Sequence, residues 1–213
     1  MTSRKKILFI LLFVAFGVLA LNIKLSNLAG STATFTLFDS FAPISGAFLG
    51  TTWGVVSVIA MQFVNFLLHG SANFDAGFAI RLIPTAFAVI YFSRNTKFNI
   101  LIPLLAMIAF ISHPIGRTVW VYSLLWLIPV ITYFFSEKSL VARSLGATFT
   151  AHAVGGALWI WAFNLPREVW LSLIPVVIIE RLLFAAGIAV SFLAVKKLLE
   201  LDVKNWLHEV FQG

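Results

Sequence analysis

Long apolar runs, separated by short breaks at glycine, proline and polar residues, most constrain the fold of this chain. The runs cover residues 6–22, 33–49, 52–69, 76–93, 98–113, 117–135, 142–163 and 168–197. Hydrophobic residues make up 61% of the 213 residues and charged residues only 11%, a balance that would leave large apolar patches in water. We therefore expect one all-α membrane domain over 1–213, a bundle of six to eight transmembrane helices arranged as hairpins.

The segment 33–49 is more polar than the other runs. Its polar residues are Thr34, Thr36, Asp39, Ser40 and Ser45. Such a segment can be a re-entrant or protein-buried half-helix, which leaves seven or eight crossings open. The following glycines, Gly46, Gly50 and Gly54, allow a tight turn or a close-packing face on one continuous helix. A helix from 33 to 69 would be about 55 Å long, too long for one crossing, so we favour the turn.

The basic residues lie between the apolar runs and indicate an orientation. If all eight segments cross from a cytoplasmic N-terminus, the inner connections carry Arg4, Lys5, Lys6, Arg94, Lys97, Lys138, Arg143, Lys196, Lys197 and Lys204. The outer connections carry Lys24, Arg117 and Arg167. This asymmetry is typical of multi-pass proteins of the cell membrane, and it places both termini in the cytoplasm. The net charge of +7 is therefore explained by the basic residues of the inner connections, and we expect no nucleic-acid partner.

The tripeptide Leu-Ile-Pro occurs four times, ending at Pro84, Pro103, Pro129 and Pro175. With Pro43, every segment that returns from outside to inside carries one proline, at intervals of 41, 45 and 46 residues. The intervals suggest four related helical hairpins whose kinked helices open one side of the bundle. The alternative is that proline is simply frequent in membrane helices and that the spacing reflects helix length.

Ionisable side chains inside apolar segments are costly in lipid, so each needs a partner or a wet cavity. Five stand out: Asp39, Arg81, His152, Glu180 and Arg181. Neighbouring residues on a helix point about 100° apart, so we expect Glu180 and Arg181 to reach different partners. The expected pairs are Glu180 with Arg81 and Asp39 with Arg181. These residues line a substrate site or, alternatively, only hold helices together.

Three uncharged residues complete the predicted substrate site. Gln62 and Asn65 are three residues apart and can face one space. Trp159 and Trp161 follow His152 at a distance that would let them stack on a ligand, and we assign Trp159 to the site.

The enzymatic alternatives have little support in the sequence. Cysteine is absent, and no zinc, nucleophile-turn or phosphate-binding motif occurs. Ser45 with His152 could form a catalytic dyad, and His69 with His113 could hold a haem. We expect neither, and hence no enzyme, no metal and no cofactor.

The run from Thr36 to Val56, TLFDSFAPISGAFLGTTWGVV, resembles the second and third helices of the substrate-binding S components of energy-coupling-factor transporters. The resemblance implies a small bundle that captures a vitamin, a vitamin precursor or a trace nutrient from outside. It also implies a transmembrane coupling subunit and ATPases as partners. S components usually have six helices, fewer than the segments counted here. The first hypothesis is thus a substrate-capture subunit, and the second is a membrane anchor or scaffold subunit of a larger complex.

Overall fold

The computed structural model describes residues 3–27, 29, 34–69 and 76–212, with side chains at 7, 9–27, 29, 34–67 and 80–200. The long helices are α1 (Ser3–Asn22), α3 (Thr51–His69), α4 (Ala76–Ser93), α5 (Phe98–Ser112), α9 (Leu140–Ala162) and α10 (Arg167–Gln212). Shorter helices are α2 (Ser45–Leu49), α6 (Pro114–Thr118), α7 (Trp120–Ser123) and α8 (Leu127–Tyr133), with 3₁₀ turns η1 (Leu37–Ser40), η2 (Ala42–Ile44) and η3 (Leu124–Trp126). Strands β1 (Lys24–Asn27) and β2 (Thr34–Thr36) form a small antiparallel sheet.

The described part of the chain is helical, as predicted, apart from this hairpin and the connecting turns. Six of the eight apolar segments coincide with single long helices, because each run of that length closes its own backbone hydrogen bonds. The segments 33–49 and 117–135 are instead broken into short helices and turns. Among the described residues, 167–200 of α10 is the one stretch of helix long and apolar enough to cross a membrane.

The polar residues of segment 33–49 explain why it is broken. The backbone N–H of Thr36 donates to the carboxylate of Asp39 at 2.8 Å, which caps η1. Ser40 and Ser45 donate to the carbonyls three residues earlier, which satisfies acceptors that a regular helix would use. Residues 40–46 are buried in the protein, with Ile44 fully inaccessible, as expected of a protein-buried segment, while its position relative to a membrane stays a prediction.

A turn at Gly50 separates α2 from α3, as expected. Its φ of +84° is favourable for glycine and strained for other residues, so the chain can reverse here. The single continuous helix of the alternative is therefore not formed. A Cβ added at Gly54 would lie 2.8 Å from the Cα of Gly46, so α2 and α3 also pack closely through these glycines.

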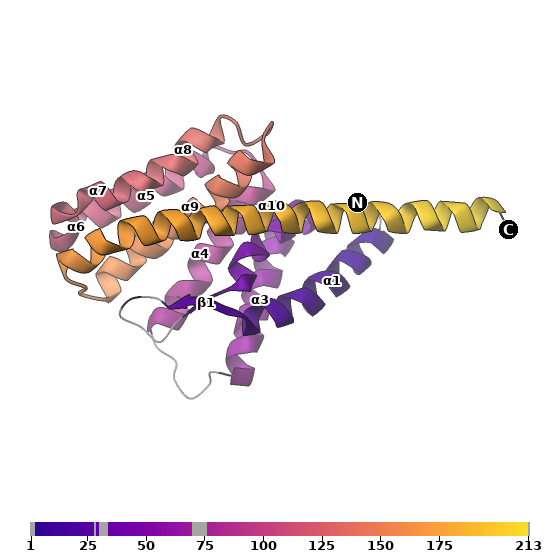
Figure 1. Ribbon diagram of the computed structural model, residues 1–213, viewed down its shortest axis with the longest axis horizontal. Helices are drawn as coiled ribbons and strands as arrows, with labels where there is room; N and C mark the ends of the chain where they lie inside the picture. Colours follow the sequence, from indigo (N-terminus) through magenta and orange to yellow (C-terminus); the bar gives the residue numbers. More distant parts are fainter. Residues whose placement is uncertain (1–2, 28, 30–33, 70–75, 213) are drawn as a thin grey trace.

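Two apolar clusters hold the bundle together. The first joins α1, η1, η2, α3, α4, α9 and residues 188–199 in the middle of α10, and includes Phe9, Phe92 and Leu199. The second joins α5, α7, α8, α9 and the N-terminal part of α10, and includes Trp126 and Trp170. Figure 1 shows α10 running along the bundle and projecting past it, at the end where α1 begins. Because α10 contributes residues to both clusters, it connects the helices of the first cluster to those of the second.

The prolines have different local roles in the described helices. Pro84, Pro103 and Pro175 lie inside α4, α5 and α10, whereas Pro43 opens η2. The carbonyl of Pro129 in α8 accepts a hydrogen bond from Tyr91 at 2.8 Å. The proposed repeat of four related hairpins stays a prediction.

Candidate functional site

A cavity of about 150 Å³ lies between α4, α7, α9, α10 and the β1–β2 hairpin. That volume is close to the space that a benzene-sized molecule fills. Six of the eight predicted site residues line it: Asp39, Arg81, His152, Trp159, Glu180 and Arg181. The other two, Gln62 and Asn65, lie on α3 and are not among the described residues that line it.

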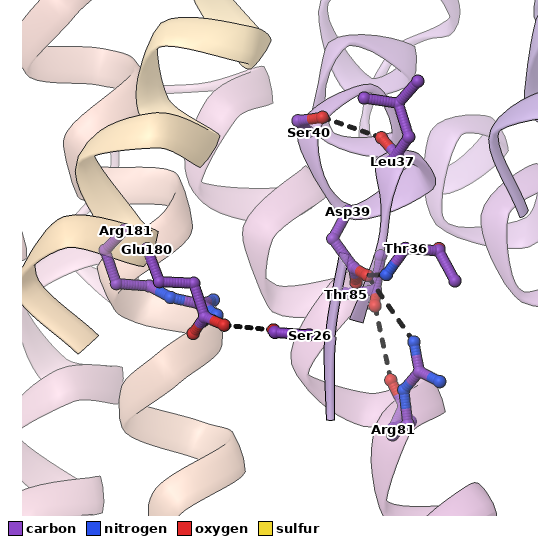
Figure 2. Close-up of polar contacts among 9 residues, drawn as sticks. All are labelled: Ser26, Thr36, Leu37, Asp39, Ser40, Arg81, Thr85, Glu180 and Arg181. Atoms are coloured by element: carbon purple, nitrogen blue, oxygen red, sulfur yellow. Dashed lines mark hydrogen bonds and ion pairs between the residues drawn. The ribbon is translucent and has the colours of Figure 1, made fainter. Parts of the chain in front are cut away.

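Asp39 and Arg81 form an ion pair at one side of the cavity. A guanidinium nitrogen of Arg81 lies 3.5 Å from a carboxylate oxygen of Asp39, and both side chains are partly exposed. The same oxygen accepts the N–H of Thr36, so the cap of η1 also aims this carboxylate at α4 (Figure 2). The expected pair of Asp39 with Arg181 is therefore wrong.

Glu180 and Arg181 pair with each other, not with separate partners as expected. Their carboxylate and guanidinium groups are 2.7 Å apart, and Ser26 of β1 donates to the second carboxylate oxygen (Figure 2). The prediction fails because both side chains are long enough to bend toward each other from adjacent positions on the helix. The guanidinium lies 4.4 Å from the ring centre of Phe35 and 4.5 Å from that of Phe184. These rings favour a cation and stabilise Arg181, which is only 2% exposed.

His152 lies in the cavity wall between two aromatic residues. The indole N–H of Trp126 donates to His152 Nδ1 at 2.9 Å, and Tyr122 Oη lies 2.9 Å from His152 Nε2. The other member of the suggested dyad, Ser45, uses its hydroxyl to donate to the carbonyl of Ala42. Both imidazole nitrogens are engaged elsewhere, so this geometry gives no support to the dyad.

The tryptophans divide between the cavity and the surface. Trp159 lines the cavity and donates to the carbonyl of Ala29 at 3.0 Å, which fastens the hairpin over the site. Trp161 is 59% exposed and donates to the carbonyl of Ala109. Trp170, which is almost fully buried, also lines the cavity.

Sequence reasoning missed Tyr122, Trp170 and the residues of the hairpin. Tyr122 and Trp126 are four residues apart, a spacing that puts two aromatic residues on one helical face and could have indicated that they act together. Ser26 and Phe35 carry no comparable signal, because they lie in a short connection whose position depends on the tertiary fold.

The metal and haem alternatives gain no geometric support. Nδ1 of His113 accepts the backbone N–H of Ile115 at 3.3 Å, which caps α6. The side chain of His69 lies outside the described residues. The part of the chain with described side chains contains no group of three His, Asp or Glu residues placed to hold a metal ion.

Comparison with known proteins identifies an archaeal sequence that is similar to this chain. No known protein family and no solved structure matches it. A protein of Methanocaldococcus jannaschii named only as uncharacterized protein MJ0923 is 26% identical over 177 residues. The match covers 74% of this chain and 59% of the relative, so the chain spans less than two thirds of the relative's length. The relative's name carries no activity that could be transferred.

Proposed function

We propose that the chain is a multi-pass protein of the cell membrane that captures a small, vitamin-like nutrient from outside. The observation that carries the proposal is the cavity, in which six ionisable or aromatic residues from different elements converge. An apolar cavity with a few orienting polar groups is typical of small-molecule binding sites. The two ion pairs also give the buried charges partners, as such residues need in lipid.

The surface of the helices supports a membrane location. On α10, the side chains of Ile179, Leu183 and Val190 are 62%, 67% and 66% exposed. On α1, those of Leu11 and Leu19 are each 63% exposed. A soluble monomer rarely leaves so many large apolar side chains in water, whereas lipid is a favourable solvent for them.

The position of the cavity supports capture from outside. Arg94 and Arg143 lie at the opposite end of α4 and α9 from the cavity, and Arg143 donates to the carbonyl of Ser93 at 3.0 Å. On α10, Lys196 follows Glu180 by 16 residues, about 24 Å along a helix. Because basic connections favour the cytoplasmic side, the cavity would open in the outer half of the membrane.

The orientation can be tested directly because the chain contains no cysteine. Intact cells that carry Lys24→Cys or Lys97→Cys would be treated with a membrane-impermeant maleimide. We expect labelling at position 24 in intact cells, and at position 97 only after the membrane is opened. The reverse result would contradict uptake from outside.

The proposed partners are a transmembrane coupling subunit and ATPases, by analogy with the S components that residues 36–56 resemble. Native mass spectrometry of the gently purified protein should find a retained small molecule, and proteomic analysis should find the ATPases. Finding neither, together with no thermal shift from candidate vitamins, would contradict the capture function.

The second candidate is an anchor or scaffold subunit, which the Glu180–Arg181 pair favours because both groups are already satisfied within the protein. Arg81→Ala separates the two functions. A capture protein should lose its small molecule and remain folded, whereas a scaffold should lose its partner subunits.

A further inference from the structure

The hydrogen bonds around His152 have a defined direction. The indole nitrogen of Trp126 can only donate, so His152 Nδ1 must be the acceptor of their bond. A ring that accepts at Nδ1 is neutral and carries its proton on Nε2. Nε2–H therefore donates to Tyr122 Oη. The hydroxyl hydrogen of Tyr122 is left to donate elsewhere.

The cavity is where that hydrogen can find an acceptor. Tyr122 is 2% exposed and lines the cavity, and the described residues supply no acceptor for its hydroxyl hydrogen. A buried hydroxyl without an acceptor is destabilising, so a ligand that accepts from Tyr122 would be favoured.

The fully buried atoms of the lining that lack a partner are donors as well. Among the described lining residues, the buried side-chain atoms without a partner are Trp170 Nε1 and Arg181 Nε, both N–H donors. Both atoms are closed to solvent, so we consider only the hydroxyl of Tyr122 as a donor to a ligand. The two carboxylate oxygens of Glu180, in contrast, already accept from Ser26 and Arg181.

The charge and shape of the cavity restrict the ligand further. Asp39 pairs with Arg81 and Glu180 with Arg181, so the ionisable pairs add no net charge. An uncharged ligand enters such a site without leaving an unpaired charge in the protein. Trp159 contributes an aromatic residue to the cavity lining, and the volume of about 150 Å³ suits a single ring.

We infer that the cavity takes a small, flat, uncharged ring compound that presents a hydrogen-bond acceptor, a ring nitrogen or a carbonyl, to Tyr122 Oη. This inference rests on the proposed capture function and specifies its substrate class.

Pyridine and pyrrole are matched probes for this inference at pH 8. They are rings of similar size, but pyridine offers only an acceptor and pyrrole only an N–H donor. Saturation-transfer NMR on the detergent-solubilised full chain would measure their dissociation constants. We expect pyridine to bind about tenfold more tightly than pyrrole, the ratio that one hydrogen bond of ordinary strength provides.

Two variants test whether Tyr122 causes the preference for pyridine over pyrrole. Tyr122→Phe should reduce the ratio of the two dissociation constants to about one, because the donor is removed. Trp126→Phe should also reduce it, because His152 can then accept from Tyr122 and leave the tyrosine oxygen free to accept. Trp161→Phe, at an exposed tryptophan outside the cavity lining, should leave the ratio unchanged.

Equal binding of the two probes by the unmodified protein, or binding of neither, would overturn the inference, whether or not the variants fold. The capture function is judged separately by the molecule retained during purification. A retained molecule that is charged or has no acceptor would overturn the inference and leave the capture function standing. If no molecule is retained and no vitamin binds, it is the capture function that fails.

Discussion

Helices α4 and α9 pack side by side, and the two ends of this pair are held by different interactions. At the end near Arg143, which we call the closed end, a Cβ added at Gly146 would overlap the ring of Tyr91. Tyr91 is buried, and its hydroxyl donates to the carbonyl of Pro129. The closed end therefore leaves no room between the helices and pairs its buried hydroxyl internally.

At the other end, which we call the cavity end, the helices are less tightly packed. A Cβ added at Gly155 would lie 3.3 Å from Pro84, a far smaller overlap than at Gly146. The space beside them is the cavity, and charged residues line it. Close packing thus stabilises the closed end, whereas the cavity end contains space that is lined by paired charges.

The largest expected effect comes from breaking the buried ion pair at the cavity end. Glu180→Gln should lower the free energy of unfolding by about 3 kcal/mol, because it leaves Arg181 charged and almost inaccessible. An SDS titration followed by circular dichroism would measure the change. Glu168→Gln, at an exposed position on the same helix, is the matched control and should have little effect. A loss no larger than the control's would mean that this pair does not stabilise the fold.

A pair of alanine substitutions tests the packing difference itself. Gly146→Ala should cost about 1–3 kcal/mol, because the new methyl group overlaps Tyr91 at the closed end. Gly155→Ala should cost less than about 1 kcal/mol, because the new methyl group would lie 3.3 Å from Pro84, a much smaller overlap than that with Tyr91. The same unfolding titration would compare them, and equal losses would remove the distinction between the two ends.

The more exposed ion pair should matter more for binding than for stability. Asp39→Asn should lower the free energy of unfolding by about 1 kcal/mol, because both partners are partly exposed and 3.5 Å apart. It should nevertheless weaken binding of the retained small molecule, measured by native mass spectrometry. Unchanged retention with a large loss of stability would assign this pair to the scaffold function.

The smallest effect is expected for an ion pair on the surface of α10. Lys196 and Glu200 lie 3.9 Å apart, with side chains 56% and 58% exposed. Glu200→Gln should change the unfolding free energy by no more than about 0.5 kcal/mol. This pair is the exposed counterpart of Glu180–Arg181 on the same helix. A loss as large as that of Glu180→Gln would show that burial does not decide the strength of these pairs.

Much of the helical structure could be read from the apolar runs. The turn at Gly50 and the broken segment 33–49 were also predictable, since glycine spacing and polar residues act locally. The β1–β2 hairpin was not predicted, because its polar residues give no strong strand pattern. The pairing of Arg81 was wrong, because depth along a helix does not determine which way a side chain faces.

The sequence by itself determined which stretches are apolar, where most of the long helices lie, and which charged residues must find partners, because these properties depend on neighbours along the chain. Only the tertiary structure decided which charges meet. It also joined Tyr122 and Trp126 to His152 and placed Ser26 beside Glu180. Those contacts depend on how each helix is rotated and packed against its neighbours, and residues far apart in the sequence set that arrangement.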